Sequence, residues 1–333
     1  MRVFITGVAG FLGSHLAERL LSLGHEVIGN DNLIGGDLDN VPKDVYFYEA
    51  DCRNLDDMED AMQGCDIVYH LACTAYEGLS VFSPCLVADN TVQASVSAMT
   101  AAIRNGAKRF VFASSMARYG AQQAPFHEGM GKKPVDPYGI SKAAAEDILK
   151  VLAETHGIEL VIAVPHNIYG PKQKYDDPFR NVAAIMMNRC LQGKAPIIYG
   201  DGEQKRCFSY ISDVLDCLVR LGFDCGLDKE TINIGPDEGT VTVNELSKII
   251  MRITGFEGEP IHVGGRPREV KHAMCLSEKA RELLGYQTKV DLETGLKEMH
   301  LWMKEKGAKD FVYHLPIEIL NDKVPKTWKE RLF

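Results

Sequence analysis

The chain has 333 residues, of which 45% are hydrophobic and 25% are charged, and its formal net charge at pH 7 is −9. This composition is ordinary for a globular protein with one large or two coupled domains. The negative charge argues against a nucleic-acid or anionic-membrane surface, so we expect no nucleic acid and no membrane as a partner. Nine cysteines without metal-ligand spacing predict a reduced, cytoplasmic protein that binds no metal.

The first segments of the chain predict a dinucleotide-binding unit. Residues 2–6 are apolar and β-branched, as in a buried strand, and residues 14–21 repeat apolar side chains at helical spacing. Between them, Gly7 would allow a tight turn, Gly10 a close approach to a pyrophosphate and Gly13 close packing of helix against strand. The start of the helix would favour the phosphates. The loop residues between these glycines also join the predicted cofactor site: Phe11 and Leu12.

A second predicted strand, residues 25–30, ends at Asp31. An acidic side chain at this position can accept hydrogen bonds from the adenosine ribose and would repel a 2′-phosphate, which favours NAD over NADP. The alternative is a glycine turn without a ligand and a solvated aspartate. The strand, the helix and the acid occur at the expected spacing, so we favour NAD.

Strands and helices continue to alternate through the first half of the chain. The strand-like segments are 45–48, 66–72, 108–113 and 158–164, and the helical segments are 55–62, 84–105 and 137–156. This alternation predicts an α/β fold with a doubly wound parallel sheet, whose ligands bind beyond the carboxyl ends of the strands. The residues at or just past these ends are Asp51, Cys52, Leu71, Ala72, Cys73, Ser115 and Asn167.

The second half of the chain has shorter elements. We expect residues 1–168 to form the NAD-binding domain, with a returning segment at about 205–235. Within that segment, residues 208–211 and 231–234 have the composition of strands that could rejoin the first sheet. Residues 169–204 and 236–333 would form a smaller, interleaved substrate lobe that closes over the edge of the sheet. The apolar anchors of its last two dozen residues predict an ordered tail.

A second pattern concerns chemistry. Tyr138 and Lys142 are four residues apart and would share one helical face. A tyrosine with its usual pKa of about 10 is a poor base, but a neighbouring ammonium group and a cationic nicotinamide both favour the phenolate. Such a tyrosine could accept a proton from a sugar hydroxyl. This spacing also occurs by chance with a packed tyrosine and a surface lysine, but Ser115 and the NAD pattern favour the catalytic interpretation.

Taken together, the glycine loop, Asp31, Ser115, Tyr138 and Lys142 resemble the extended short-chain dehydrogenase/reductase superfamily. Within it, the chain is similar to nucleotide-sugar epimerases and dehydratases, and most to UDP-hexose 4-epimerases. The resemblance implies a Rossmann fold, NAD as cofactor and a nucleotide-sugar substrate over nearly the whole chain. It adds cofactor contacts at Asn32, Asn90, Ser114 and Pro165. It adds substrate contacts at Met116, Asn167, Asn181, Arg206 and Arg266, the two arginines being suited to the diphosphate.

The residues after Ser115 narrow the reaction. The family's 4,6-dehydratases have an acid pair here, whereas this chain has Met116 and Ala117, which cannot transfer protons. A site that oxidises and re-reduces one carbon remains, as a 4-epimerase requires. Arg118 stands where the family often has valine. We expect it to be a surface charge near the site; a contact to a substrate carboxylate is the alternative.

Other departures keep further functions open. Pro165 and His166 resemble a variant found in some keto-sugar epimerase-reductases, so a 4-keto nucleotide-sugar reductase or epimerase-reductase is the alternative enzyme. His166 would be a packed or hydrogen-bonded wall of the pocket more readily than a proton carrier. Cys73 would be a small residue that lines the cofactor. A non-catalytic NAD-binding scaffold is less favoured, because Ser115, Tyr138 and Lys142 are all present.

The resemblance also suggests substrate width and assembly. In related epimerases, the seventh residue after the arginine of Arg-Pro lines the sugar pocket, and here it is Ala273. A small residue there would admit a UDP-N-acetylhexosamine as well as a plain UDP-hexose, unless Ala273 lies in the core. Family members form a homodimer through the helices that match 84–105 and 137–156. The apolar residues expected to supply contacts on the first of these helices are Val92, Val96, Met99 and Ile103.

Overall fold

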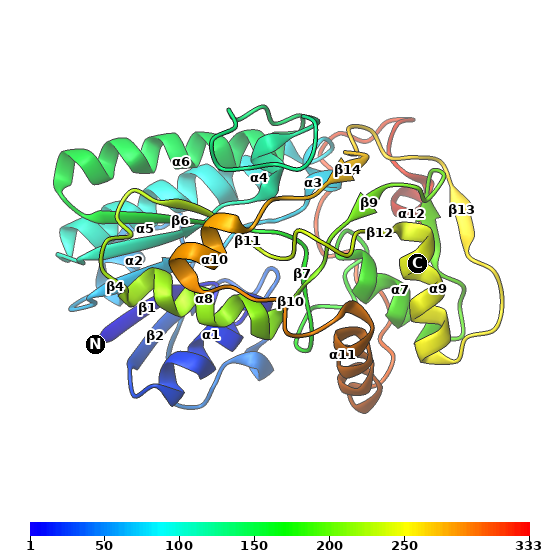
Figure 1. Ribbon diagram of the computed structural model, residues 1–333, viewed down its shortest axis with the longest axis horizontal. Coiled ribbons are helices and arrows are strands. Elements are labelled where there is room, and N and C mark those ends of the chain that lie inside the picture. The colour runs from blue at the N-terminus through cyan, green and yellow to red at the C-terminus, as the bar shows by residue number, and fades with distance from the viewer.

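Seven parallel strands form the main sheet in the computed structural model, which describes residues 1–333 (Figure 1). Their spatial order is β11-β6-β5-β4-β1-β2-β3, so the strand order reverses between β1 and β4. The bounds are β1 Arg2–Thr6, β2 Glu26–Asp31, β3 Tyr46–Glu49, β4 Ile67–His70, β5 Arg109–Ala113, β6 Glu159–Pro165 and β11 Thr231–Ile234. The predicted doubly wound sheet is therefore confirmed, and its reversal point is where such sheets bind ligands.

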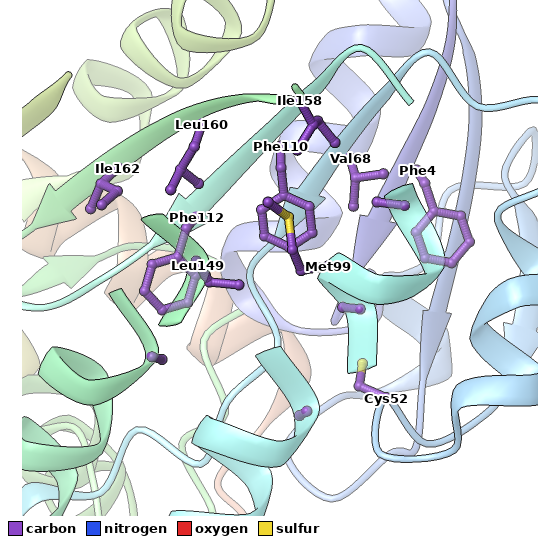
Figure 2. Packing of buried hydrophobic residues seen from close by; sticks show 14 of the residues in the cluster. Phe4, Cys52, Val68, Met99, Phe110, Phe112, Leu149, Ile158, Leu160 and Ile162 are labelled. Carbon is purple, nitrogen blue, oxygen red and sulfur yellow. The ribbon is translucent and has the colours of Figure 1, made fainter. Parts of the chain in front are cut away.

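Helices cover both faces of this sheet (Figure 1). On one face lie α2 (Leu55–Ala61), α5 (Ala94–Arg104) and α6 (Pro137–His156), and on the other α1 (Phe11–Ser22), α8 (Ile211–Phe223) and α10 (Glu278–Leu284). Successive residues of β5 serve the two cores, because side chains of a strand alternate between faces. Phe110 and Phe112 pack with Met99 and Leu149 (Figure 2), whereas Val111 packs with the α1 and α8 side chains.

Residues 84–104 form a continuous helical run with an irregular middle. It consists of α4 (Pro84–Ala88), one π-helical turn, η2 (Asp89–Gln93), and α5. Such turns redirect side chains within a helix and are frequent at functional sites. Here the turn contains Asn90, a predicted cofactor residue.

The prediction that two later segments rejoin the main sheet is half correct. Residues 231–234 do so as β11, which pairs with β6. Ser209–Tyr210, β10, instead pairs with β7 (Ile168–Tyr169) in a separate two-stranded sheet. The position next to β6 is occupied by β11, so β10 does not pair there.

The second lobe is built around three helices, α7 (Val182–Leu191), α9 (Val243–Thr254) and α11 (Leu292–Lys306), which share an apolar cluster. Its strands are β8 Ile197–Tyr199, β9 Lys205–Arg206, β12 Val241–Thr242, β13 Ile261–Val263 and β14 His272–Ala273. Helix α9 begins at a reciprocal cap between Thr242 and Glu245 and ends at Gly255, which adopts a φ of +70°. None of the helices in the molecule combines the length and apolar character needed to cross a membrane.

The C-terminal tail is ordered, as its apolar anchors predicted. Trp328 of α12 (Lys326–Lys329) packs in a cluster with Phe82 and Phe179, and its indole N–H donates to the carbonyl of Pro178 at 3.1 Å. The same cluster includes Leu79 of the short helix α3 (Glu77–Ser80). The tail therefore joins the two parts of the molecule beside the carboxyl edge of the sheet.

Candidate active site

A cavity of about 460 Å³ lies beyond the carboxyl ends of the strands. Its walls come from the glycine loop, the ends of the main-sheet strands, the first turn of α6 and the second lobe. The predicted site residues that line it are Gly7, Gly10, Phe11, Leu12, Gly13, Asp31, Asn32, Asp51, Cys52, Leu71, Ala72, Cys73, Asn90, Ser114, Ser115, Tyr138, Lys142, Pro165, Asn167, Asn181, Arg206 and Arg266. The tertiary structure thus brings together residues that are far apart in the sequence.

The glycine loop requires its glycines for steric reasons. Gly7 has a φ of +72°, and a Cβ there would stand 3.0 Å from the Cα of Ala72, across the reversal point of the sheet. A Cβ on Gly13 would lie 2.1 Å from the carbonyl oxygen of Gly7. Helix α1 begins with Gly10 as its N-cap, and no side chain caps it. Its first N–H groups therefore remain available to an anion.

Asp31 lies at the end of β2 with only 7% of its surface exposed. Burial raises the pKa of this carboxyl group, while the backbone N–H groups of Leu33 and Ala9 oppose the shift. Those N–H groups donate at 2.8 and 3.1 Å and fix the carboxylate in place. It is therefore held at the cavity wall, where it can accept hydrogen bonds from a ribose.

Asp51 and Asn32 form a second polar pair nearby. The Asn32 amide donates to Asp51 at 3.0 Å. Burial alone would raise the pKa of Asp51, but hydrogen bonds from Arg53 and Asn32 lower it to about 2. This carboxylate is ionised at neutral pH and can accept hydrogen bonds from a ligand.

These features fit a dinucleotide. The glycine loop and the uncapped start of α1 suit its phosphates, and Asp31 suits a ribose. In addition, the amide nitrogen of Asn90 is buried at the cavity without a hydrogen-bond partner in the protein. A buried donor of this kind is costly unless a ligand or water accepts from it.

Tyr138 is placed by the way that α6 begins. Asp136 is the N-cap and accepts from the N–H of Gly139 at 2.8 Å, and Pro137 occupies the first turn. Tyr138 follows directly, with 5% of its surface exposed. Burial raises the pKa of its phenol well above the usual value, the Cys73 thiol adds to this, and the Ser115 side chain opposes it.

Lys142 lies one turn farther along α6 and is almost fully buried. Its ammonium group donates to the carbonyl of Ala113 at 2.7 Å and lies 4.8 Å from the centre of the Phe112 ring. The pKa of Tyr138 is nevertheless raised in the protein alone, because burial of the phenol dominates. The expected lowering of this pKa is therefore not seen without a bound cofactor.

Ser115 stands at the end of β5, as the N-cap of a short 3₁₀ turn, η3 (Met116–Tyr119). Its hydroxyl accepts from the N–H of Ala117 at 3.2 Å. This turn packs against α6, which holds Ser115 and Tyr138 in one region of the cavity.

Of two polar side chains after the strands, Arg118 differs from the expectation, whereas His166 is packed and hydrogen-bonded as expected. Arg118 is not a surface charge: it is 4% exposed and pairs with the buried carboxylate of Glu146. It does not line the cavity, so it is no substrate contact either. His166 is fully buried behind the cavity wall, where its Nε2 lies 3.1 Å from the carbonyl of Pro236. Burial lowers its pKa to about 4, which leaves it neutral and hydrogen-bonded.

Two predicted substrate contacts do not line the cavity. Met116 and Ala273 both belong to the apolar cluster on the α5 and α6 face of the sheet. The backbone of β14 pairs Ala273 with Arg206, and the Ala273 side chain is 8% exposed. The inference that Ala273 admits an N-acetyl group therefore falls, since packing has placed this residue in the core.

The two arginines predicted to bind the diphosphate do line the cavity. Both also make contacts with other groups of the protein. Arg206 donates to backbone carbonyls, including that of Val270 at 2.6 Å. Arg266 pairs with Glu269 at 2.7 Å and lies 4.8 Å from the centre of the Tyr199 ring. Asn181, the N-cap of α7, completes this wall.

Some cavity residues were not anticipated. Glu77 of α3, Arg180 and the C-terminal Phe333 all line the cavity. No spacing or periodicity singles them out, because each depends on how a loop or the tail folds back over the sheet. The position of Arg180 directly before Asn181 is the one sequence signal that could have suggested it.

Comparisons with known proteins agree with this geometry. The model of the NAD dependent epimerase/dehydratase family matches residues 3–235. A putative UDP-glucose 4-epimerase of Methanocaldococcus jannaschii is 34% identical over 92% of this chain and 99% of its own length. The structure of UDP-glucose 4-epimerase from Thermotoga maritima with UDP-glucose is similar, with a TM-score of 0.87 and 33% identity over 92% of this chain and 99% of that one.

A structure with a bound cofactor is also similar. It is the UDP-glucose 4-epimerase of Thermus thermophilus in complex with NAD, with a TM-score of 0.84 and 31% identity over 91% of this chain and 98% of that one. The family model covers most of the chain, and the glycine loop, Asp31 and the Ser115, Tyr138 and Lys142 group occupy one cavity. The chain therefore belongs to the NAD-dependent epimerase/dehydratase family.

Proposed function

We propose that the protein is an NAD-dependent nucleotide-sugar 4-epimerase that acts on a UDP-sugar. One observation carries this proposal: Ser115, Tyr138 and Lys142 line the same cavity as the dinucleotide loop, while Met116 and Ala117 put no acid or base beside them. The two positions that hold an acid pair in the family's 4,6-dehydratases therefore supply no proton transfer in this chain. Similar proteins that are UDP-glucose 4-epimerases support the same reaction.

The roles of the three residues follow from their chemistry. Bound NAD would accept a hydride from C4 of the sugar and later return it. Tyr138 would take the proton of the 4-hydroxyl group as the C4–H bond breaks, and Ser115 would hydrogen-bond the same oxygen. Lys142 has three donor hydrogens, of which one is used by Ala113. The other two can serve a ribose, and its positive charge favours the ionised phenol when the proton is transferred.

Inversion requires that the 4-keto sugar turn over before the hydride returns to its other face. The diphosphate must stay bound meanwhile, and Arg206, Arg266 and Asn181 are the groups that could hold it. Hydride lost in the first half is regained in the second, so no cofactor is consumed. The reductase alternative loses its support, because the unusual His166 is neutral and lies behind the wall of the cavity.

The test identifies the sugar products and checks that NAD is not consumed. The purified protein is incubated with NAD and UDP-galactose or UDP-glucose, and the anomeric signals of both sugars are followed by NMR. We expect the two sugars to approach one equilibrium mixture without net change in NADH absorbance at 340 nm. Stoichiometric oxidation of NADH by a 4-keto nucleotide sugar, without epimerisation, would contradict the proposal.

We also propose a homodimer. On α6, Ile140, Ile148 and Val151 expose 53%, 37% and 63% of their surface, and with Ala144 they share one face of the helix. An apolar stripe on a long helix suits a second copy of the same helix. The earlier choice of Met99 as a contact was wrong, since Met99 is fully buried in the core.

The cysteines support a reducing compartment such as the cytoplasm. All nine are free thiols, and Cys85 and Cys225 are exposed. Exposed free thiols persist where cellular reductants keep them reduced. Oxidation-sensitive labelling of these two thiols in whole cells would test the assignment.

A further inference from the structure

Two cavity arginines, Arg268 and Arg180, have guanidinium groups that make neither a hydrogen bond nor an ion pair with the protein; Arg268 is exposed, whereas Arg180 is partly buried. Arg180 lies two residues before α7 and lines the cavity together with Tyr138. Its guanidinium lies over the ring of Tyr76, whose centre is 5.1 Å away. Arg206 and Arg266, in contrast, donate to backbone carbonyls or to Glu269.

The three arginines also sit in different electrostatic surroundings. The acids that act on Arg206 and Arg266 are Glu77 and Glu269. For Arg180, the groups that act on its charge include Asp177, Cys73 and the catalytic Tyr138. The packing also places Arg180 near Tyr138: the Tyr76 ring under its guanidinium follows Ala75, which packs against the small cluster that contains Tyr138.

The segment that carries Arg180 is held in place by hydrogen bonds to the carboxylate of Asp177. One oxygen of Asp177 accepts from the Tyr76 hydroxyl at 2.5 Å, and the other accepts from the N–H of Phe179 at 2.8 Å. Asp177 and Tyr76 are both nearly fully buried. Asp177 thus balances the charge of Arg180 at a distance and leaves the guanidinium donors directed at no protein acceptor.

We infer that Arg180 binds a carboxylate on the sugar, so that the preferred substrate is a UDP-hexuronate. The inference rests on the proposed function, because it places the sugar beside Tyr138. In a hexuronate the carboxylate is attached to C5, the carbon next to the C4 that reacts, so it lies close to the catalytic phenol. A guanidinium and a carboxylate match in charge and geometry and can form two parallel hydrogen bonds. A neutral hydroxymethyl group offers no such partner.

Binding to the NAD-loaded protein tests this without any need for turnover. Isothermal titration with UDP-glucuronate, UDP-glucose and UDP should show UDP-glucuronate bound roughly 10- to 100-fold more tightly than UDP-glucose, the range for a hydrogen bond to a charged group. Arg180→Met should abolish that difference and leave the affinity for UDP and UDP-glucose within about twofold. Arg180→Lys should restore part of this difference in affinity, since lysine keeps the positive charge but cannot form two parallel hydrogen bonds with a carboxylate.

Arg266→Met is the matched control, because it should weaken all three ligands alike. Retained NAD and an unchanged unfolding temperature show that each variant is folded. If the unmutated protein binds UDP-glucose and UDP-glucuronate equally, the inference is overturned. It is also overturned if Arg180→Met weakens UDP itself, which would make Arg180 a phosphate ligand.

The same titrations separate this inference from the proposed function. Arg180-dependent binding of UDP-glucuronate without formation of its 4-epimer would contradict the 4-epimerase and support the carboxylate site. Interconversion of UDP-glucose and UDP-galactose with no preference for a hexuronate would support the 4-epimerase and contradict the carboxylate site.

Discussion

Arg118 and Glu146 form an ion pair inside the protein, with 3.0 Å between Nη2 and Oε2 and with side chains that are 5% and 0% exposed. The other carboxylate oxygen of Glu146 accepts from the hydroxyl of Ser114. The pair therefore ties the turn that carries Ser115 to the helix that carries Tyr138. Removing Arg118 leaves Glu146 only the more distant Lys132, 3.8 Å away, as a counter-charge, which costs more than replacing both partners of the pair.

We predict that Arg118→Met lowers the free energy of unfolding by about 3–5 kcal/mol, the usual cost of removing one partner of a buried pair. Adding Glu146→Gln should recover part of the loss, because the amide is neutral and can still accept from Ser114. Urea unfolding of the two variants and the unmutated protein measures this. A double variant that is less stable than Arg118→Met would contradict the pairing.

Tyr138→Phe removes the proposed proton acceptor and keeps the ring. We expect kcat to fall by roughly 10²- to 10⁴-fold, as is typical for general acid–base groups, while the affinity for UDP changes little. Steady-state kinetics and titration with UDP check the two parts. Full activity of Tyr138→Phe in a matched assay would assign the base to another group.

Asp31→Asn tests the cofactor preference by removing the charge, while its one side-chain oxygen can still accept from either Leu33 or Ala9. Because the ionised carboxylate repels a 2′-phosphate, the unmutated protein should bind NAD far more tightly than NADP. The variant should narrow the ratio roughly tenfold or more, as expected for loss of a charge-assisted hydrogen bond. Titration with both cofactors measures it, and equal affinities in the unmutated protein would disprove the assignment.

Val151→Asp should disrupt the proposed dimer, since it places a charge on the exposed apolar stripe of α6. Light scattering at micromolar concentration should give a dimer for the unmutated protein and a monomer for the variant. Leu301→Asp is the control, because Leu301 is 64% exposed on α11, outside that stripe. A monomeric unmutated protein would refute the assembly.

Two buried histidines predict loss of stability in mild acid. Burial lowers the pKa of His70 to about 3 and that of His166 to about 4, against 6.5 for an unperturbed side chain. At a pH between the folded and the unperturbed pKa, the histidine binds a proton in the unfolded chain and not in the folded protein. The stabilisation is therefore fully present above pH 6.5 and declines as the pH falls toward 4, by about 1.4 kcal/mol per pH unit for each histidine.

Urea unfolding between pH 7.5 and 5 should show this decline. His166→Gln keeps a donor for the carbonyl of Pro236. It should reduce the slope of the unfolding free energy against pH by the contribution of one proton, about 1.4 kcal/mol per pH unit. An unchanged slope in that variant would mean that His166 titrates alike in both states.

Much of the site followed from local sequence signals. The glycine loop, Asp31 at a strand end and the Asp136-Pro137 start of α6 act over a few residues, so their consequences can be predicted from spacing alone. The strand ends then share one edge because a parallel sheet places all its carboxyl ends together. This is why Ser115, Tyr138 and Lys142 could be expected at the cofactor before their contacts were known.

The sequence by itself thus determined the doubly wound sheet, the NAD-binding loop and the meeting of Ser115, Tyr138 and Lys142 in one cavity. Only the tertiary structure decided which neighbouring polar and small side chains face the substrate. Arg118 is buried because Glu146, far along the chain, supplies its counter-charge, and Ala273 is in the core because β14 pairs beside Arg206. Arg180 lines the cavity without an ion pair, while the nearby Asp177 accepts from the Tyr76 hydroxyl and the Phe179 N–H. Such outcomes depend on long-range packing partners, which no local pattern of residues encodes.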